Sequence, residues 1–207
     1  MSRFSQAISE GDGISVIPML DGDVEDLARA AQEAGAEALA VRSSNEAERV
    51  RAGSTLPVIV LQPVGGIESL RALHAGGADA CLLVFEELEG AADLLEELYA
   101  EAVELGLDCA LSVRDEEELE AALERVDPEV LVLSEREPEK GEEELERTLE
   151  LLPDVPVGKL VISESQVVAR EQVLALERAG VDAVLLGAAL PHPFGDALAT
   201  LTGRSLI

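Results

Sequence analysis

The chain alternates short apolar runs with stretches of helical periodicity, and the alternation recurs eight times along its length. Several of the runs, such as ACLLVF and AVLLG, are apolar almost without interruption, which is typical of parallel strands covered on both faces. The alternation therefore predicts an α/β fold built on a parallel sheet. The expected strands are residues 14–20, 38–42, 57–62, 79–85, 108–113, 129–133, 159–163 and 182–187.

The stretches between these runs carry apolar residues at the spacing of helices that bury one face. Positions 24, 27, 28 and 31 follow the i, i+3, i+4, i+7 rule, and positions 119, 122, 123 and 126 repeat it. Asp115, with Glu118 three residues later, forms the pattern of a capping box at a helix start. Gly35, Gly106 and Gly180 stand where helices are expected to end.

An internal repeat narrows the choice of architecture. AGAEALAV (34–41), GGADACLLV (76–84) and AGVDAVLLG (179–187) each combine a helix end, a glycine, an acidic residue and a strand. Eight units in 207 residues leave about 26 residues for each, near the lower limit for a (β/α)8 TIM barrel. The alternative is an open doubly wound sheet, which needs a glycine-rich phosphate loop after its first strand, and MLDGDVED is not one. We expect a single-domain barrel over residues 13–207 after a short N-terminal lead-in, 1–12.

The charge balance limits the classes of partner. Asp and Glu number 43 against 15 Lys and Arg, a formal net charge of −28, which argues against binding to nucleic acid or to an anionic membrane surface. Hydrophobic residues make up 47% of the chain, so it is not a disordered acidic tail. No apolar run reaches the about 18–20 residues of a membrane span, and no signal peptide is evident. We expect a cytoplasmic protein whose acidity suits a salty environment or high solubility.

Two cysteines, Cys81 and Cys109, lack the spacing of metal ligands. They fit buried thiols in a reducing compartment. The sequence gives no reason to expect a metal or another cofactor.

In a TIM barrel, ligands bind at the C-terminal ends of the strands. One such end lies in the segment KLVISESQVVAREQVLALERAGVDAVLLGAAL (159–190), which resembles the last two strands of the indole-3-glycerol-phosphate synthase family, where SESGI precedes AGxDAxLVGESLM. DCALSVRDEEELEAAL (108–123) is similar to the fifth strand and helix of that family. Weaker similarity in PVIVLQ, GGADACLLV and RFSQAISEGDGISVIP extends the resemblance over nearly the whole chain.

The resemblance implies a TIM-barrel lyase of tryptophan biosynthesis. The family closes the indole ring of a carboxyphenylamino-deoxyribulose phosphate with loss of CO2 and water. This reaction needs an ammonium group as acid, carboxylates that move protons, and backbone amides that hold the phosphate.

When the functional residues of the family are placed on this sequence position by position, neither of the family's two ammonium groups is present. The lysine of strand one falls on Asp21, and the lysine of strand three falls on Leu61. Met19 stands where the first strand has a glutamate, while Ser44 and Ser112 replace the glutamates of strands two and five.

The resemblance is closer at the positions where the family binds phosphate than at the positions of its ammonium groups. Ser134 replaces an asparagine, but Arg136 keeps the following arginine. Glu164 and Ser165 are both retained. We therefore expect a small phosphorylated ligand near Ser134, Arg136, Ser165, Gln166 (in place of a glycine), Gly187 (retained) and Ala188 (in place of a serine).

The two lysines are the remaining candidates for a catalytic ammonium. Lys159 opens the seventh expected strand, at the end of the barrel away from the site, whereas Lys140 lies in the loop after the sixth. Lys140 as acid and Glu164 as base would form a relocated catalytic pair.

Three functions follow. The first is a catalytically degraded barrel, or one with a changed phosphate-type ligand. The second is an active synthase that uses the relocated pair. The third is a barrel that serves as an interaction or regulatory subunit for an unidentified protein partner.

Overall fold

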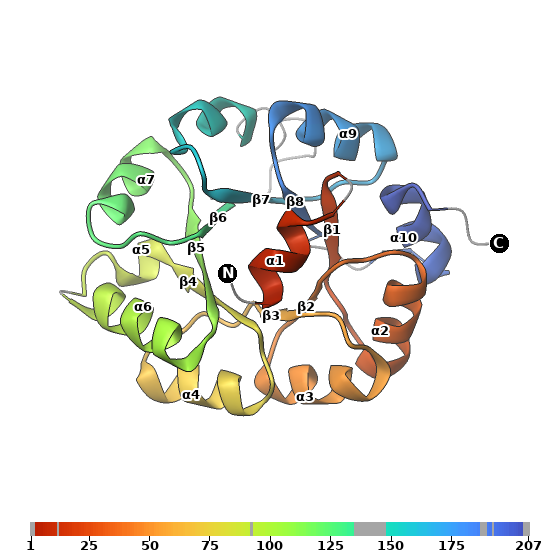
Figure 1. The fold of residues 1–207 in the computed structure, drawn as a ribbon, viewed down its shortest axis with the longest axis horizontal. Helices are drawn as coiled ribbons and strands as arrows, with labels where there is room; N and C mark the ends of the chain where they lie inside the picture. The colour runs from red at the N-terminus through yellow and green to blue at the C-terminus, as the bar shows by residue number, and fades with distance from the viewer. Residues whose placement is uncertain are drawn as a thin grey trace.

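The computed structural model describes residues 3–11, 13–91, 93–134, 148–186, 190–191 and 193–204. Within this part, eight parallel strands form one sheet in the order β1-β8-β7-β6-β5-β4-β3-β2. A parallel bridge between Met19 and Ala40 joins the two end strands. The sheet therefore closes into a ring, with helices around its outside (Figure 1). The prediction of a TIM barrel is confirmed, and the open doubly wound alternative is excluded.

The strands are β1 (Ser15–Pro18), β2 (Leu39–Val41), β3 (Val58–Val60), β4 (Ala80–Val84), β5 (Asp108–Val113), β6 (Val130–Leu133), β7 (Leu160–Ser165) and β8 (Ala183–Leu186). The helices are α1 (Arg3–Ser9), α2 (Val24–Glu33), α3 (Ser44–Gly53), α4 (Ile67–Ala75), α5 (Phe85–Leu88), α6 (Leu94–Leu105), α7 (Glu116–Leu123), α9 (Arg170–Ala179) and α10 (Phe194–Thr202). Residues 148–151 are also helical and lead into a short 3-10 helix, η1 (Leu152–Asp154).

The expected strands match in number and place, and β7 is the one that runs beyond its expected end. The sequence predicts that this strand stops at residue 163, but it continues to Ser165 because β8 pairs with it there. Glu164 is in register with Leu185, and Ser165 with Leu186. Glu164 therefore lies on a strand of the barrel wall and not in the loop that follows.

Local helix signals behave as predicted. The Asp115 carboxylate accepts a hydrogen bond from the Glu118 backbone N–H at 2.9 Å, which starts α7. Gly106 and Gly180 end α6 and α9 with φ of 74° and 101°, in the left-handed region that favours glycine.

The acidic residue of the internal repeat has a structural role at the N-terminal end of the barrel. The Asp79 carboxylate accepts the backbone N–H of Val58 at 2.7 Å, and the Asp182 carboxylate accepts that of Val161 at the same distance. Each carboxylate precedes one strand and binds the start of the strand before it. The repeat therefore joins neighbouring strands where they begin.

Helix α1 closes the N-terminal end of the barrel. Phe4 and Ile8 are buried within the same cluster as the inward-facing strand residues. The backbone N–H of Ser5 donates to the carboxylate of Asp108, at the start of β5, over 2.7 Å. Figure 1 shows α1 inside the ring of strands. The sequence marks this segment only as a lead-in, and the structure makes it part of the inner core.

The outer core lies between the strands and the surrounding helices. Cys81 and Cys109 lie there, opposite each other in register on β4 and β5, and both are free, buried thiols as predicted. Among the described residues, no helix has the length and apolar character to cross a membrane.

Candidate functional site

The C-terminal ends of the neighbouring strands β5, β6 and β7 each carry a polar side chain: Ser112, Ser134 and Glu164. Ser112 is in register with Val84, which packs on the inner cluster, and Glu164 is in register with Leu185, which belongs to it. Since register partners in a parallel sheet share a face, Ser112 and Glu164 face the barrel interior. We call Ser112, Ser134 and Glu164 the polar arc.

A direct contact joins two members of the polar arc. The hydroxyl oxygens of Ser112 and Ser134 are 2.7 Å apart, a hydrogen bond in which either can donate. Ser112 is 5% exposed, whereas Ser134 and Glu164 are half-buried. Ser112 thus forms the deep end of the arc, and Ser134 and Glu164 are its accessible side.

Apolar side chains occupy the mouth at the ends of β1, β3 and β4. Met19 is buried within the inner cluster, and Leu61 and Val84 are partly buried against it. Leu61 stands where the resemblance places a lysine, and its side chain packs with the core. The mouth therefore joins a polar side to an apolar side.

Asp21, at the other position where the resemblance places a lysine, lies at the rim. Its carboxylate is 4.0 Å from the guanidinium of Arg42, and both side chains are more than half exposed. Asp23 pairs with Arg49 over 3.5 Å in the same way. Ser44 is the first residue of α3 rather than a residue of the wall.

A partly buried cation at the rim was missed from the sequence. The guanidinium of Arg114, 11% exposed, forms ion pairs with Glu118 and Glu86. The hydrogen bond to Glu118, more than any other contact, raises the pKa of Arg114 above its ordinary value. The spacing of Arg114 and Glu118, four residues apart, is the signal that could have indicated this pair.

The hydroxyl of Ser165 is turned away from the mouth. It lies 2.6 Å from the hydroxyl of Ser163, which is 3.2 Å from that of Thr148. These three buried hydroxyls form a chain between β7 and residues 148–151. Only the backbone of Ser165 is therefore a candidate for ligand binding, and Gln166 follows it at the end of β7.

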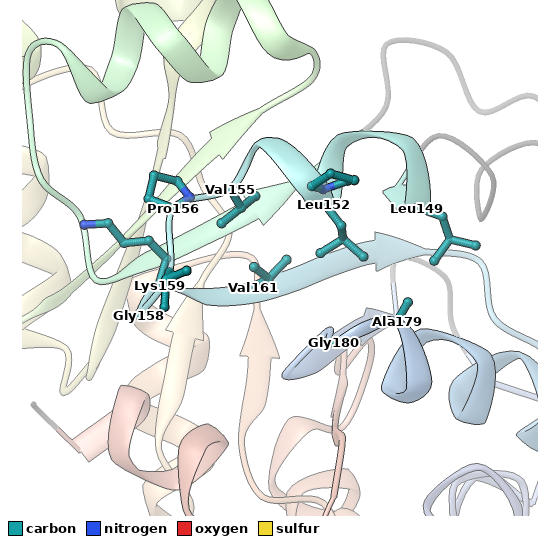
Figure 2. Close-up of a pocket in the computed structure, with 11 residues that line it drawn as sticks. Leu149, Leu152, Val155, Pro156, Gly158, Lys159, Val161, Ala179 and Gly180 are labelled. Carbon is teal, nitrogen blue, oxygen red and sulfur yellow. The ribbon is translucent and has the colours of Figure 1, made fainter.

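Four predicted site residues lie outside the described residues: Arg136, Lys140, Gly187 and Ala188. The other lysine, Lys159, precedes β7 at the N-terminal end of the barrel, as predicted, and its ammonium pairs with Asp127. It borders a groove of about 320 Å³ beside the start of β7, lined mainly by apolar residues (Figure 2). This groove lies on the outside of the barrel, away from the polar arc. In the part of the chain that the structure describes, no cluster of His, Cys, Asp and Glu could hold a metal ion.

Comparison with known proteins identifies relatives over most of the chain. The family model of indole-3-glycerol phosphate synthase matches residues 64–195. The indole-3-glycerol phosphate synthase of Geobacillus sp. (strain WCH70) is 31% identical over 176 residues, which are 79% of this chain and 66% of that protein. The one from Geobacillus thermodenitrificans (strain NG80-2) is 30% identical over 178 residues, 82% of this chain and 68% of that protein. The chain thus spans about two thirds of the length of these relatives.

Solved structures share the architecture at lower identity. A mutant tryptophan synthase alpha-subunit from the hyperthermophile Pyrococcus furiosus superposes with a TM-score of 0.69 at 17% identity, covering 98% of this chain and 100% of that one. A tryptophan synthase complex from the same organism gives a TM-score of 0.66 at 18% identity, with the same coverage. These likenesses establish the fold alone.

Proposed function

Because this chain belongs to the indole-3-glycerol phosphate synthase family, we propose that it is a member without the ring-closing activity, whose mouth binds a small phosphorylated ligand. The observation that carries the proposal is the position of Leu61. Its side chain packs against the inner cluster at the place where the family has an ammonium group. A hydrocarbon side chain cannot protonate a leaving group or polarise a carbonyl.

The second ammonium position supports the same conclusion. Asp21 carries the opposite charge and faces solvent beside Arg42. The partly buried guanidinium at the rim, that of Arg114, is bound by Glu118 and Glu86. A guanidinium with so high a pKa is a poor proton donor at neutral pH. Within the described residues of the mouth, no side chain therefore takes over the acid's role.

Charge also opposes the family's substrate. That substrate carries a phosphate and a carboxylate, and the chain has a net charge of −28. At physiological ionic strength, with a Debye length of about 8 Å, salt screens distant charges, but at the rim Asp21 places a negative charge where the family has a positive one. We infer that the ligand differs from the family's substrate.

The ligand-binding part of the proposal concerns the segments after β7 and β8. Backbone N–H groups beside Gln166 and Gly187, with Ser165 and Ala188 next to them, would hold the phosphate, and Arg136 would add charge. Backbone amides bind phosphate without needing the side chains that this chain has replaced. This role therefore survives the loss of the lysines.

A second candidate is an active synthase that uses Lys140 as acid and Glu164 as base. The family match favours it, because residues 64–195 include both groups. Expression in a tryptophan auxotroph that lacks the synthase separates the two candidates. We expect soluble protein and no growth without tryptophan. Growth that depends on Lys140, and is lost in Lys140→Ala, would establish the second candidate and refute the first.

A further inference from the structure

The segment of residues 166–169 joins β7 to α9, and one side chain fixes its far end. The side-chain oxygen of Gln172, in the first turn of α9, accepts the backbone N–H groups of Val168 and Ala169 at 2.9 and 3.1 Å. Such a bond from the third helical residue back to the helix start is half of a capping box. The end of the segment is therefore tied to α9 before the chain enters the helix.

Three buried hydroxyls fix the near end of the segment. The hydroxyl oxygen of Ser163 lies 2.6 Å from that of Ser165 and 3.2 Å from that of Thr148, and we call these three groups the hydroxyl chain. All three residues are at most 5% exposed. Ser163 is in register with Leu133 and Val184, which belong to the apolar outer core. A hydroxyl in such surroundings is unfavourable unless it is hydrogen-bonded, so the hydroxyl chain holds the end of β7 in one arrangement.

Between these two fixed points lies a backbone donor without an acceptor. Val167 is 6% exposed, and its side chain packs in the outer core. Among the residues that the structure describes, no oxygen accepts its backbone N–H. The great majority of buried backbone N–H groups in folded proteins are paired, and an unpaired one calls for an ion, a ligand or a water molecule. Val167 therefore marks a place on the segment where an oxygen atom from outside the chain can bind.

We propose that the backbone N–H of Val167 binds a phosphate oxygen, and that Gln172 and the hydroxyl chain are positioning groups that fix this N–H before the ligand arrives. This inference rests on the proposed function and adds to it one donor and the side chains that hold it. A backbone amide binds phosphate without help from a lysine. A donor that is already fixed loses little conformational entropy when the ligand binds. Phosphate affinity should therefore depend on side chains that do not contact the phosphate.

Inorganic phosphate, titrated into the ¹⁵N-labelled whole chain at about 0.15 M NaCl, tests the inference by amide NMR. The amide resonance of Val167 should shift and saturate, and its titration curve gives the dissociation constant. Gln172→Ala removes the acceptor of two N–H groups and should weaken phosphate binding at least about fivefold. Thr148→Val replaces one hydroxyl of the chain by a methyl group and should weaken binding at least about twofold.

Matched variants separate positioning from a general loss of stability. Thr148→Ser keeps the hydroxyl and removes the methyl group, so it should bind phosphate as tightly as the natural chain. Gln32→Ala removes a side-chain oxygen that accepts the Ser54 hydroxyl and the Thr55 N–H at 2.7 and 3.1 Å. These residues lie at the ends of α2 and α3, away from the mouth, so phosphate binding should not change. Thermal melts establish that each variant is folded and how much stability it has lost.

The outcomes distinguish this inference from the function on which it rests. If phosphate shifts only amides after β8 and not that of Val167, the inference fails and the phosphate site stands. The inference also fails, with the phosphate site intact, if Gln172→Ala and Thr148→Val bind phosphate as tightly as the natural chain. It fails in the same way if Gln32→Ala weakens binding as much as Gln172→Ala, or Thr148→Ser as much as Thr148→Val. If the natural chain does not bind phosphate, both the inference and the phosphate part of the proposed function fail.

Discussion

The inner-core role of α1 can be tested with the substitution Phe4→Ala. The side chain of Phe4 has no exposed surface and packs in the inner cluster at the N-terminal end of the barrel. Removal of a fully buried phenyl ring costs about 3–5 kcal/mol, from lost burial and from the cavity that remains. A domain of this kind has only about 5–15 kcal/mol of stability in total. The variant should therefore unfold at a much lower urea concentration.

Urea unfolding followed by circular dichroism measures this loss, with the slope of the transition unchanged. Gln6→Ala is the matched control, because Gln6 is exposed on the same helix and its loss should cost at most about 0.5 kcal/mol. Ligand binding at the mouth should persist in Phe4→Ala wherever the protein is folded, since α1 closes the opposite end. A loss of stability below about 1 kcal/mol would show that α1 does not pack in the barrel as described.

Three further predictions concern charge and thiol chemistry. A hydrogen bond from Arg125 lowers the pKa of Glu96 to about 2 from 4.5. Arg125→Ala should therefore be less stable than the natural chain by a constant amount above pH 4.5, and this difference should vanish as the pH falls towards 2. Urea unfolding of both proteins measures the difference, and a difference that does not change with pH would contradict the pair. With a net charge of −28, repulsion among acidic side chains should destabilise the fold at low salt. The melting temperature should therefore rise between 0.1 M and 1 M KCl, because the Debye length falls from about 10 Å to about 3 Å. An unchanged melting temperature would show that this repulsion is unimportant. The hydrogen bond with Cys81, together with burial, raises the pKa of the Cys109 thiol. Because both thiols are buried, a disulfide reagent should modify the two cysteines only after urea unfolding. Rapid labelling of the native chain would contradict this expectation.

The architecture could be predicted from the sequence because its causes are local and repeated. Apolar runs such as that of β4, and the glycines that end α6 and α9, act within a few residues of themselves. The end of β7 was placed too early because pairing with β8, some twenty residues away, extends it to Ser165. The inner position of α1 depends on contacts with strands far along the chain, such as that of Ser5 with Asp108.

The site was predicted less completely, for physical reasons that differ by residue. The motif indicated Glu164 at the C-terminal end of the seventh strand, but not that the strand includes it. The 2.7 Å contact between Ser112 and Ser134 depends on the stagger of β5 and β6. The outward turn of the Ser165 hydroxyl follows from strand alternation once β7 is known to include it. Arg114 was not predicted as a partly buried cation, because its pairing with Glu86 depends on how α5 packs against the end of β5.

The most direct test of the proposed loss of activity is a measurement of ring closure by the purified chain. The carboxyphenylamino-deoxyribulose phosphate is added, and the fluorescence of the indole product is followed beside the synthase of Geobacillus thermodenitrificans as a positive control. We predict no product above the rate without protein, for the natural chain and for Lys140→Ala alike. Product formed at a rate comparable to that of the control would contradict the central claim that replacement of the family's ammonium groups by Asp21 and Leu61 has removed catalysis.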